Sequence, residues 1–288
     1  MPLTENSYGK SNVRLTKVVR SGAVHALFEI DAAIALEGRF DCAYTDGDNT
    51  TCVATDSMKN TVYVLAKESA FTSVEQFAGI LAHHFVRTYP QVSRVTIELT
   101  QTAWRRIEVD GRPHDHAFTG GGAHRRVARA KLSRDAPLAL GGGVRNLRVL
   151  KTTDSQWHTF VTDRYRTLKD SFDRILATQI DADWQYSADA AGIDFDAADA
   201  AIHAAILTTF ANHFSLGVQQ TLLAMGEAAL AACGVVDRID FALPNLHRIP
   251  FNLEPFGLTF ENDIYVATDE PYGLIKGTVV RDKQGEKR

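Results

Sequence analysis

The same order of secondary-structure signals occurs twice along this chain. Each half has two segments of strand-like alternation, then two segments with helical spacing of apolar residues, then two more extended segments. In the first half these segments are 13–20, 25–40, 58–68, 74–88, 93–109 and 124–132. In the second half they are 145–153, 173–186, 195–210, 216–233, 238–243 and 263–280. The pattern predicts an α+β fold of two tandem ββααββ units, 1–136 and 137–288.

Local signals mark several boundaries of these elements. Ser73 is a favourable N-cap for the helix that follows, with Gln76 three residues later. Gly22 predicts a hairpin between the first two strands. We also predict a loop at 120–122 and a helix C-cap at Gly234.

Composition and charge exclude several classes of protein. The 288 residues are 45% hydrophobic with a formal net charge of −4, which allows a packed core and gives no basic excess for nucleic acid. The three cysteines lack CxxC spacing, so neither a disulfide framework nor a zinc knuckle is expected. No apolar run reaches the roughly 18 residues of a membrane helix, and the first residues do not resemble a signal peptide. We therefore expect a cytoplasmic protein that binds neither nucleic acid nor a membrane.

Residues 44–63 contain the most informative local pattern. A polar, turn-prone loop leads into a short apolar run, and three residue types that favour N-caps follow at Thr55, Asp56 and Ser57. A helix starting at Met58 would aim backbone N–H groups and the Thr55 hydroxyl at whatever lies in front of it. Such a position suits an anion or a polar small molecule. The alternative is that Thr55 and Asp56 only cap the helix.

Residues 44–63 and seven other motifs resemble, in one order, the motifs of a single enzyme family. The seven are Tyr8-Gly9-Lys10-Ser11-Asn12-Val13-Arg14 and the segments 111–118, 147–153, 173–178, 218–221, 243–247 and 273–276. Together they are similar to the signatures of urate oxidase (uricase). So many motifs in one order are far more specific than any single pattern.

The resemblance implies a fold, an assembly and an activity. Uricases have the tunnelling fold (T-fold), in which antiparallel sheets from several ββααββ units close into a β-barrel with helices outside. Because units that cannot close alone leave sheet edges open, we expect an oligomer, and the resemblance implies a homotetramer with active sites at subunit interfaces. The implied reaction is the oxidation of urate by O2 and water to 5-hydroxyisourate and H2O2, without a cofactor.

The resemblance also assigns a proton relay. Lys10, Thr55 and His247 match the catalytic lysine, threonine and histidine of the family, and Asn245 matches the residue that holds O2 or water with Thr55. From residue type alone Lys10 could equally be a solvated lysine, because a lysine acts as a base only where burial lowers its pKa. The family commonly has Lys where Leu246 stands here. Alternation along a strand is expected to turn Leu246 away from the site.

Substrate-binding residues are implied in the same way. Arg174 and Gln219 match the clamp that grips urate, and Phe160 matches the aromatic residue that stacks on its ring. A guanidinium can donate two parallel hydrogen bonds to one edge of a planar heterocycle, and an amide both donates and accepts. From residue types alone, Arg174 could instead pair with Asp173, Gln219 could face water and Phe160 could be core. The other implied contacts come from Thr55, Asp56, Leu168, Val218, Asn245 and Ile275.

Two patterns resemble other kinds of site. The histidines at 83, 84, 114, 116 and 124 lack HExxH or Cys/His spacing, so we expect no metal and assign the 114–116 segment a bracing role in its loop. The glycines at 141–143 are not a dinucleotide fingerprint, because no GxGxxG leads from a strand into a helix.

Two other functions remain open on the sequence. Another T-fold enzyme, of the zinc-dependent hydrolase type, could use the same clamp on a purine or pterin ring. A non-catalytic purine-binding protein could keep the pocket, although binding alone would not require Lys10, Thr55, Asn245 and His247 together. Metal analysis and a urate turnover assay distinguish these functions.

Overall fold

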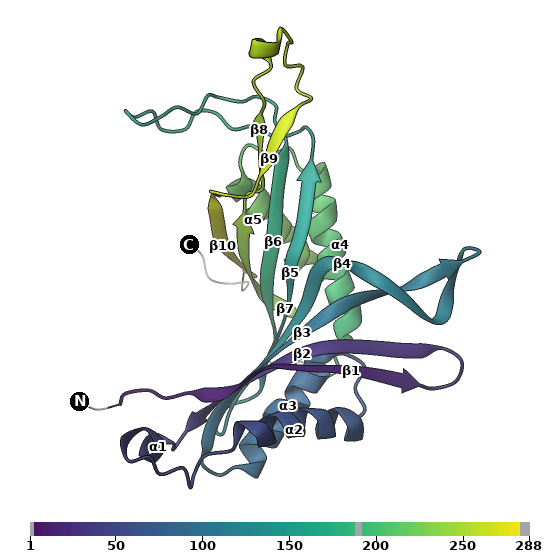
Figure 1. Cartoon of the computed structure of the whole chain (residues 1–288), viewed down its shortest axis with the longest axis vertical. Coiled ribbons are helices and arrows are strands. Elements are labelled where there is room, and N and C mark those ends of the chain that lie inside the picture. Colours follow the sequence, from purple (N-terminus) through teal and green to yellow (C-terminus); the bar gives the residue numbers. More distant parts are fainter. Residues whose placement is uncertain (1–2, 188–191, 283–288) are drawn as a thin grey trace. The chain divides into compact units, whose positions relative to one another are not determined.

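The chain divides into two compact units. The computed structural model describes residues 3–187 and 192–282. The first unit comprises Met1–Arg145 with Gln185–Asp196, and the second comprises Asn146–Trp184 with Ala197–Arg288 (Figure 1). Among the described residues, no helix is both long and apolar enough to cross a membrane.

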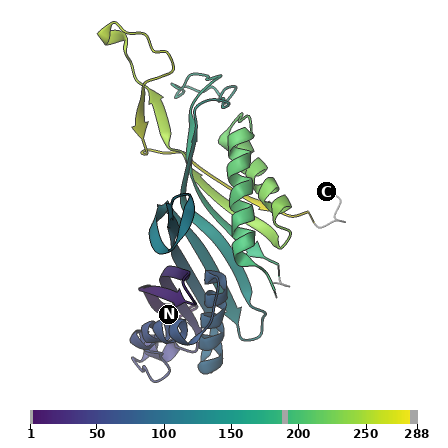
Figure 2. The same ribbon diagram turned by 90° about the vertical axis from the view of Figure 1, so that its right-hand side faces the viewer.

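The first unit is an antiparallel sheet with helices on one face. Its strands are β1 (Tyr8–Arg20), β2 (His25–Gly38), β3 (Val92–Val109), β4 (Arg112–Ser133) and the first part of β5 (Ala139–Lys151), which are neighbours in this order. The short helix α1 (Asp41–Thr45) precedes α2 (Thr55–Glu68) and α3 (Val74–Thr88). Helix α2 packs on β1, and α3 packs on β3 and β4 (Figures 1 and 2).

The core of the first unit lies between this sheet and these helices. Phe77 and Phe85 of α3 and Leu36 and Ile97 of the sheet are fully buried in one cluster. Along β2, residues alternate between buried and partly exposed, as expected for a strand with one covered face. Burying each such side chain contributes about 1.5–3 kcal/mol, so this alternation holds the helices on the sheet.

The second unit repeats the plan and adds a hairpin. The rest of β5, β6 (Leu176–Tyr186), β7 (Val236–Pro244) and β10 (Leu274–Val280) are neighbours in this order. Helix α4 (Phe195–Asn212) precedes α5 (Val218–Ala232), and α5 packs on β7 and β10. The approach is close, since a Cβ on Gly226 would lie 2.5 Å from Val279. Strands β8 (His247–Pro250) and β9 (Tyr265–Thr268), with the 3-10 helix η1 (Glu254–Phe256), form a hairpin that extends away from the sheet (Figure 2).

An Asn and a Lys recur at the same spacing in the first strand of each unit. Asn12 in β1 and Asn146 in β5 both have a φ of 58°, a left-handed conformation that Asn tolerates better than most residues. Lys17 donates to two carbonyls at the end of α2, at 2.7 and 2.8 Å. Lys151 donates to a carbonyl just beyond α4. Together with the matching element order, this confirms the predicted duplication.

Several predicted boundaries are confirmed. Ser73 Oγ accepts a hydrogen bond from the Gln76 backbone N–H at 3.2 Å, and Gln76 Oε1 accepts from the Thr72 N–H at 2.9 Å. This reciprocal cap begins α3, and Tyr89 ends it as C-cap. Gly22 lies in the β1–β2 connection with a φ of 80°, which favours glycine.

Other predicted boundaries are wrong. Helix α2 begins at Thr55, not Met58, with Ala54 as N-cap and no side-chain cap, so Thr55 does not serve as the cap. Residues 120–122 are not a loop but part of β4. A Cβ on Gly121 would lie 2.9 Å from Ala103 of β3, so the absence of a side chain allows the two strands to stay paired closely there.

Boundaries in the second half also differ from the prediction, and β5 begins at Ala139 rather than 145. Strand β6 begins at Leu176 rather than 173, which leaves Arg174 in a loop. The predicted strand 263–280 is divided into β9 and β10, and Pro271, which cannot donate to a ladder, lies between them. Helix α5 ends with Cys233 as an extended C-cap, so Gly234 does not have that role.

Candidate active site

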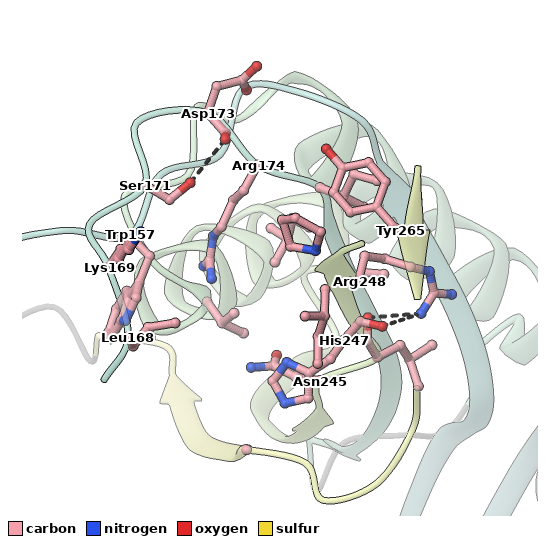
Figure 3. Close-up of a pocket in the computed structure, with 18 of the residues that line it drawn as sticks. Trp157, Leu168, Lys169, Ser171, Asp173, Arg174, Asn245, His247, Arg248 and Tyr265 are labelled. Atoms are coloured by element: carbon pink, nitrogen blue, oxygen red, sulfur yellow. Dashed lines mark hydrogen bonds between the residues drawn. The ribbon is translucent and has the colours of Figure 1, made fainter. Parts of the chain in front are cut away.

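A cavity of about 630 Å³ lies within the second unit. Its wall combines the loop before β6, the start of α5, the ends of β7 and β10, and the β8–β9 hairpin (Figure 3). The structure therefore brings together side chains that are far apart in the sequence, from Trp157 to Ile275. The predicted site residues that line it are Leu168, Arg174, Val218, Gln219, Asn245, His247 and Ile275.

Arg174 presents an unpaired guanidinium to this cavity. Its backbone N–H donates to the Ser155 carbonyl at 3.0 Å, which fixes the main chain. Its Nε is buried and has no hydrogen-bond partner among the described residues. Asp173 points away from it (Figure 3) and accepts from the Thr153 hydroxyl at 2.9 Å, so the alternative of an Arg174–Asp173 pair is excluded. Burial lowers the pKa of the Arg174 guanidinium, which nevertheless stays charged at neutral pH.

Gln219 and Gln220 have different roles at the start of α5, one on the cavity wall and the other as a helix cap. Gln220 Oε1 accepts from the Leu216 backbone N–H at 3.0 Å, so Gln220 caps its own helix. Gln219 lines the cavity, and its amide forms no hydrogen bond with any residue that the structure describes. Val218 beside it is buried and places the first-turn backbone N–H groups at the cavity wall. Gln219 is thus available to a ligand in a way that Gln220 is not.

Asn245 and His247 lie where β7 passes into the hairpin. The Asn245 N–H donates to the Gly273 carbonyl at 2.9 Å, and Asn245 Oδ1 is buried without a partner in the described part of the chain. Arg248 donates to the carbonyls of Leu246 and His247, at 3.2 and 2.8 Å (Figure 3). Leu246 is buried but also borders the cavity, contrary to the expectation that alternation would turn it away from the site.

Phe160 lies behind the cavity wall rather than on it. Trp157 and Tyr265 are aromatic residues that do line the cavity, and Trp157 stacks on Phe160 with 5.5 Å between ring centroids and 13° between planes. The Arg166 guanidinium lies over the Phe160 ring at 4.1 Å. Leu168 stands at the rim and is 60% exposed. Sequence reasoning missed Trp157, for which the aromatic character of the 156–165 segment was the only signal.

Lys10, Thr55 and Asp56 form a second group, in the first unit. The Tyr8 hydroxyl accepts from the Val53 N–H at 2.6 Å and donates to the Val53 carbonyl at 3.2 Å, which ties the start of β1 to the segment before α2. Lys10 and Thr55 stand two residues further along these two segments. Burial raises the pKa of Tyr8 to about 12.

Two local features set the direction of Lys10 and the charge of Asp56. A Cβ on Gly9 would lie 1.7 Å from the carbonyl oxygen of Ile34 in β2, so only glycine fits before Lys10. A bulge between Lys10 and Val13 then changes the register of β1. The hydrogen bond and charge of Lys59, and to a smaller extent the charge of Lys10, hold the pKa of the exposed Asp56 carboxyl below its usual range. Lys10 and Asp56 are therefore electrostatic neighbours.

The histidines of 114–116 have a structural role. His114 Nδ1 accepts from the backbone N–H groups of His116 and Ala117, at 3.3 and 3.1 Å, so His114 does brace the local backbone. The predicted loop is wrong, however, because the segment lies within β4, opposite a register shift in β3. Among the described residues, no three His, Cys, Asp or Glu side chains are grouped so that they could hold a metal ion.

Comparison with known proteins decides the family. The family model described as Uricase matches residues 6–131 and 140–276. The chain belongs to the uricase family. Curated uricases from Arthrobacter globiformis and Aspergillus flavus are 39% and 35% identical to it, over 97% and 95% of this chain and 90% and 95% of their own.

Solved structures agree with this assignment. The crystal structure of the Arthrobacter globiformis uricase matches with a TM-score of 0.91 at 38% identity, covering 100% of this chain and 97% of its own. A urate oxidase from Bacillus sp. TB-90 shares the fold with a TM-score of 0.83 at 22% identity, over 96% and 100% of the two chains. The predicted α+β T-fold is confirmed. Neither rival, the zinc-dependent hydrolase nor the non-catalytic binding protein, is favoured by these matches to uricases.

Proposed function

We propose that this chain oxidises urate with O2 and water to 5-hydroxyisourate and H2O2, without a cofactor. The observation that carries the proposal is the cavity in which an unpaired Arg174 guanidinium, a free Gln219 amide and the orphaned Asn245 oxygen converge. Membership of the uricase family supports it. Arg174 Nε and Asn245 Oδ1 are buried without a partner among the described residues, which is costly, so a site that keeps both is suited to a polar ligand.

The clamp holds a flat, polar heterocycle. Arg174 donates two parallel hydrogen bonds to one edge of urate, and Gln219 donates to and accepts from the other groups along that edge. Backbone contacts come from Val218, and Leu168 and Ile275 supply apolar walls. The resemblance assigns ring stacking to Phe160, but Phe160 lies behind the cavity wall, against Trp157.

The proposed reaction transfers two electrons and two protons to O2. The relay of Lys10, Thr55 and His247 accepts a proton from bound urate, with Asp56 beside it at the pocket edge, and leaves a more electron-rich anion. Two electrons pass from this anion to O2, which is held near Thr55 and Asn245 and leaves as H2O2 after taking up two protons. Water adds its hydroxyl to the oxidised ring and releases a proton, which gives 5-hydroxyisourate. Urate supplies both electrons, so the balance requires no flavin or metal.

The assembly we propose is a homotetramer with shared sites. The clamp belongs to the second unit and Lys10, Thr55 and Asp56 belong to the first, which supports a site completed across a two-fold interface. Antiparallel sheets of several chains would close the oligomeric β-barrel. The repeat boundary near Ala136 and a cytoplasmic location are further parts of the proposal.

Urate turnover by chelated protein tests the function. Protein treated with a strong chelator is mixed with urate while the urate absorbance and the H2O2 released are followed together. We expect loss of urate with one H2O2 per urate, unchanged by chelation, and no flavin absorbance. A stoichiometric metal whose removal abolishes turnover would instead support the hydrolase, and binding without turnover would support the non-catalytic protein.

A further inference from the structure

The short connection from β7 to β8 carries two residues of the proposed site. Strand β7 ends at Pro244 and β8 begins at His247, so the chain between them lies outside both strands. Asn245 forms only an isolated bridge there, opposite Thr178 of β6. Where a ladder stops in this way, backbone N–H and C=O groups need other partners. Those partners decide how firmly Asn245 and His247 are held.

The Thr178 hydroxyl is one of these partners. Thr178 is 1% exposed, and its hydroxyl donates to the Pro244 carbonyl at 2.9 Å. One residue earlier on β6, the Ala177 carbonyl accepts from the Leu246 N–H at 2.9 Å. A hydroxyl buried this deeply is costly to leave unpaired, which favours the bonded arrangement. Strand β6 therefore holds the chain on both sides of Asn245.

Arg248 secures the other end of the connection. Its Nη1 donates to the carbonyls of Leu246 and His247, at 3.2 and 2.8 Å (Figure 3). The guanidinium is planar and rigid, so one nitrogen shared between two successive carbonyls restricts the orientation of both peptides. The backbone that carries His247 is thus held by a neighbouring side chain in addition to the β8–β9 ladder.

These contacts leave the Asn245 and His247 side chains for the cavity, which both of them line. Asn245 Oδ1 is buried and has no hydrogen-bond partner in the described part of the chain. On the other side of the amide, a Cβ on Gly273 would lie 3.4 Å from Asn245 Nδ2. Because no hydrogen bond fixes this oxygen, its position depends on the backbone beneath it.

We propose that Thr178 and Arg248 are positioning residues for Asn245 and His247. This inference rests on the proposed function, which gives Asn245 a place at the O2 site and His247 a place in the proton relay. Thr178 and Arg248 act through the backbone and take no part in proton or electron transfer. Misplacing a reacting group by about 1 Å can cost about 100-fold in rate, so their loss lowers turnover rather than ligand affinity.

Substitution of Thr178 separates positioning from binding. Thr178→Val removes the hydroxyl and keeps the side-chain volume, so we expect kcat to fall about tenfold and the KM for O2 to rise. The Kd of an inert xanthine analogue stays within about twofold of wild type, because the clamp is untouched. Thr178→Ser keeps the hydroxyl and restores kcat to within about twofold of wild type.

Thr221→Val is the matched control for the loss of a buried hydroxyl. Thr221 is also 1% exposed, and its hydroxyl donates to Ser215 Oγ at 2.8 Å instead of to the β7–β8 connection. Both Val variants lose a buried hydrogen bond and some stability. We expect only Thr178→Val to lower kcat and raise the KM for O2.

Arg248→Met tests the same connection from β8 and does not depend on whether Thr178→Val folds. It should also lower kcat at an unchanged analogue Kd. Because both side chains hold one segment, the double variant should lose less in kcat than the product of the two single losses. Amide hydrogen exchange of the peptide that contains Asn245 and Leu246 should become faster in each single variant.

Four results would overturn the inference. They are an unchanged kcat in folded Thr178→Val or in Arg248→Met, an equal loss of kcat in Thr221→Val, a Thr178→Ser variant as slow as Thr178→Val, and a raised analogue Kd in Arg248→Met, which would show that its charge attracts the ligand. Failure of the proposed function looks different, because the wild type itself would leave urate unoxidised while amide exchange in the variants still became faster.

Discussion

At the scale of single residues, neighbours of the same type differ in whether the local backbone already uses them. Gln220 satisfies the Leu216 N–H and is occupied, whereas Gln219 one position earlier is left for a ligand. Asp173 is held by the Thr153 hydroxyl, and the Arg174 beside it keeps its charge unpaired. Buried polar groups without partners are rare, so the buried Arg174 Nε on the cavity wall identifies a binding side chain better than residue type does.

Arg174→Ala is expected to impair ligand binding, whereas Thr55→Ala is expected mainly to impair turnover. Arg174→Ala removes a charged guanidinium that can donate two parallel hydrogen bonds. Its loss weakens binding of urate and of an inert xanthine analogue alike, by about 3 kcal/mol. Thr55→Ala reduces kcat more than analogue affinity, because its proposed place is in the relay and the oxygen site. Calorimetric titration with the analogue beside steady-state kinetics checks both. If Thr55→Ala weakened analogue binding as much as Arg174→Ala, this division of roles would be wrong.

The Tyr8 brace makes a prediction about pH. Tyr8→Phe removes both bonds to Val53 and lowers the free energy of unfolding by about 1–3 kcal/mol near neutral pH. Because burial raises the pKa of Tyr8 from 10.0 to about 12, the unfolded chain loses this proton first as pH rises. The contribution of Tyr8 is therefore complete below pH 10 and declines from there to about pH 12.

Denaturant unfolding of the wild type and of Tyr8→Phe at about pH 8 and about pH 11.5 measures the contribution of Tyr8. The difference in unfolding free energy between the two proteins should narrow at the higher pH. A difference that stays constant over this interval would show that Tyr8 ionises as easily in the folded protein as in the unfolded chain.

At the scale of elements, the loop before β6 is organised by one arginine. Arg166 donates to the Leu168 carbonyl at 3.1 Å, to the Thr162 hydroxyl at 2.7 Å and to Asp170 at 2.8 Å, and its guanidinium covers Phe160. The loop has few regular hydrogen bonds of its own, so these contacts hold the residues behind the cavity wall in place. A loop ordered by side chains rather than by a ladder opens more easily than the strands around it.

Arg166→Met is expected to loosen this loop while the rest of the fold stays intact. Amide hydrogen exchange followed by mass spectrometry should become faster within 156–175 and stay unchanged in β7 and α5, while the KM for urate rises several-fold. Arg164→Met is the control, because Arg164 contacts only the exposed Tyr165 among the described residues. If amide exchange within 156–175 became equally faster in both variants, Arg166 would have no special role in ordering this loop.

The elements that sequence could predict are those with a strong period or a local cap. Alternation marked β2, helical spacing marked α3, and the Ser73–Gln76 pair fixed the start of α3, since each signal lies within one segment. The β8–β9 hairpin and the start of β6 carry no such period. The cavity could not be predicted from residue chemistry, because Trp157 and Arg174 acquire their roles only from contacts across the second unit. Resemblance, not chemistry, singled out Arg174.

At the scale of the whole molecule, the two units are repeats that use one equivalent position for different purposes. Gln76 and Gln220 cap α3 and α5 in the same way, so Glu75 occupies in the first unit the position of Gln219 in the second. Glu75 is fully buried and pairs with Arg126 at 2.8 Å. The first unit therefore uses this position for an internal ion pair, and the second leaves it facing a cavity. One chain accordingly provides one clamp, and Lys10 and Thr55 of the other unit are free to serve a different role.

Mixed refolding tests most directly whether the clamp and the relay act together in one site shared by two chains. Lys10→Met and Arg174→Ala chains, each nearly inactive alone, are denatured together, refolded and assayed with urate. In a mixed two-fold pair, one site inherits both lesions and the other inherits neither. Random reassembly makes about half of the pairs mixed and leaves half of their sites intact, so activity should return to about a quarter of wild type. Activity equal to the average of the two separate variants, with mixed oligomers confirmed by mass spectrometry, would contradict the shared site.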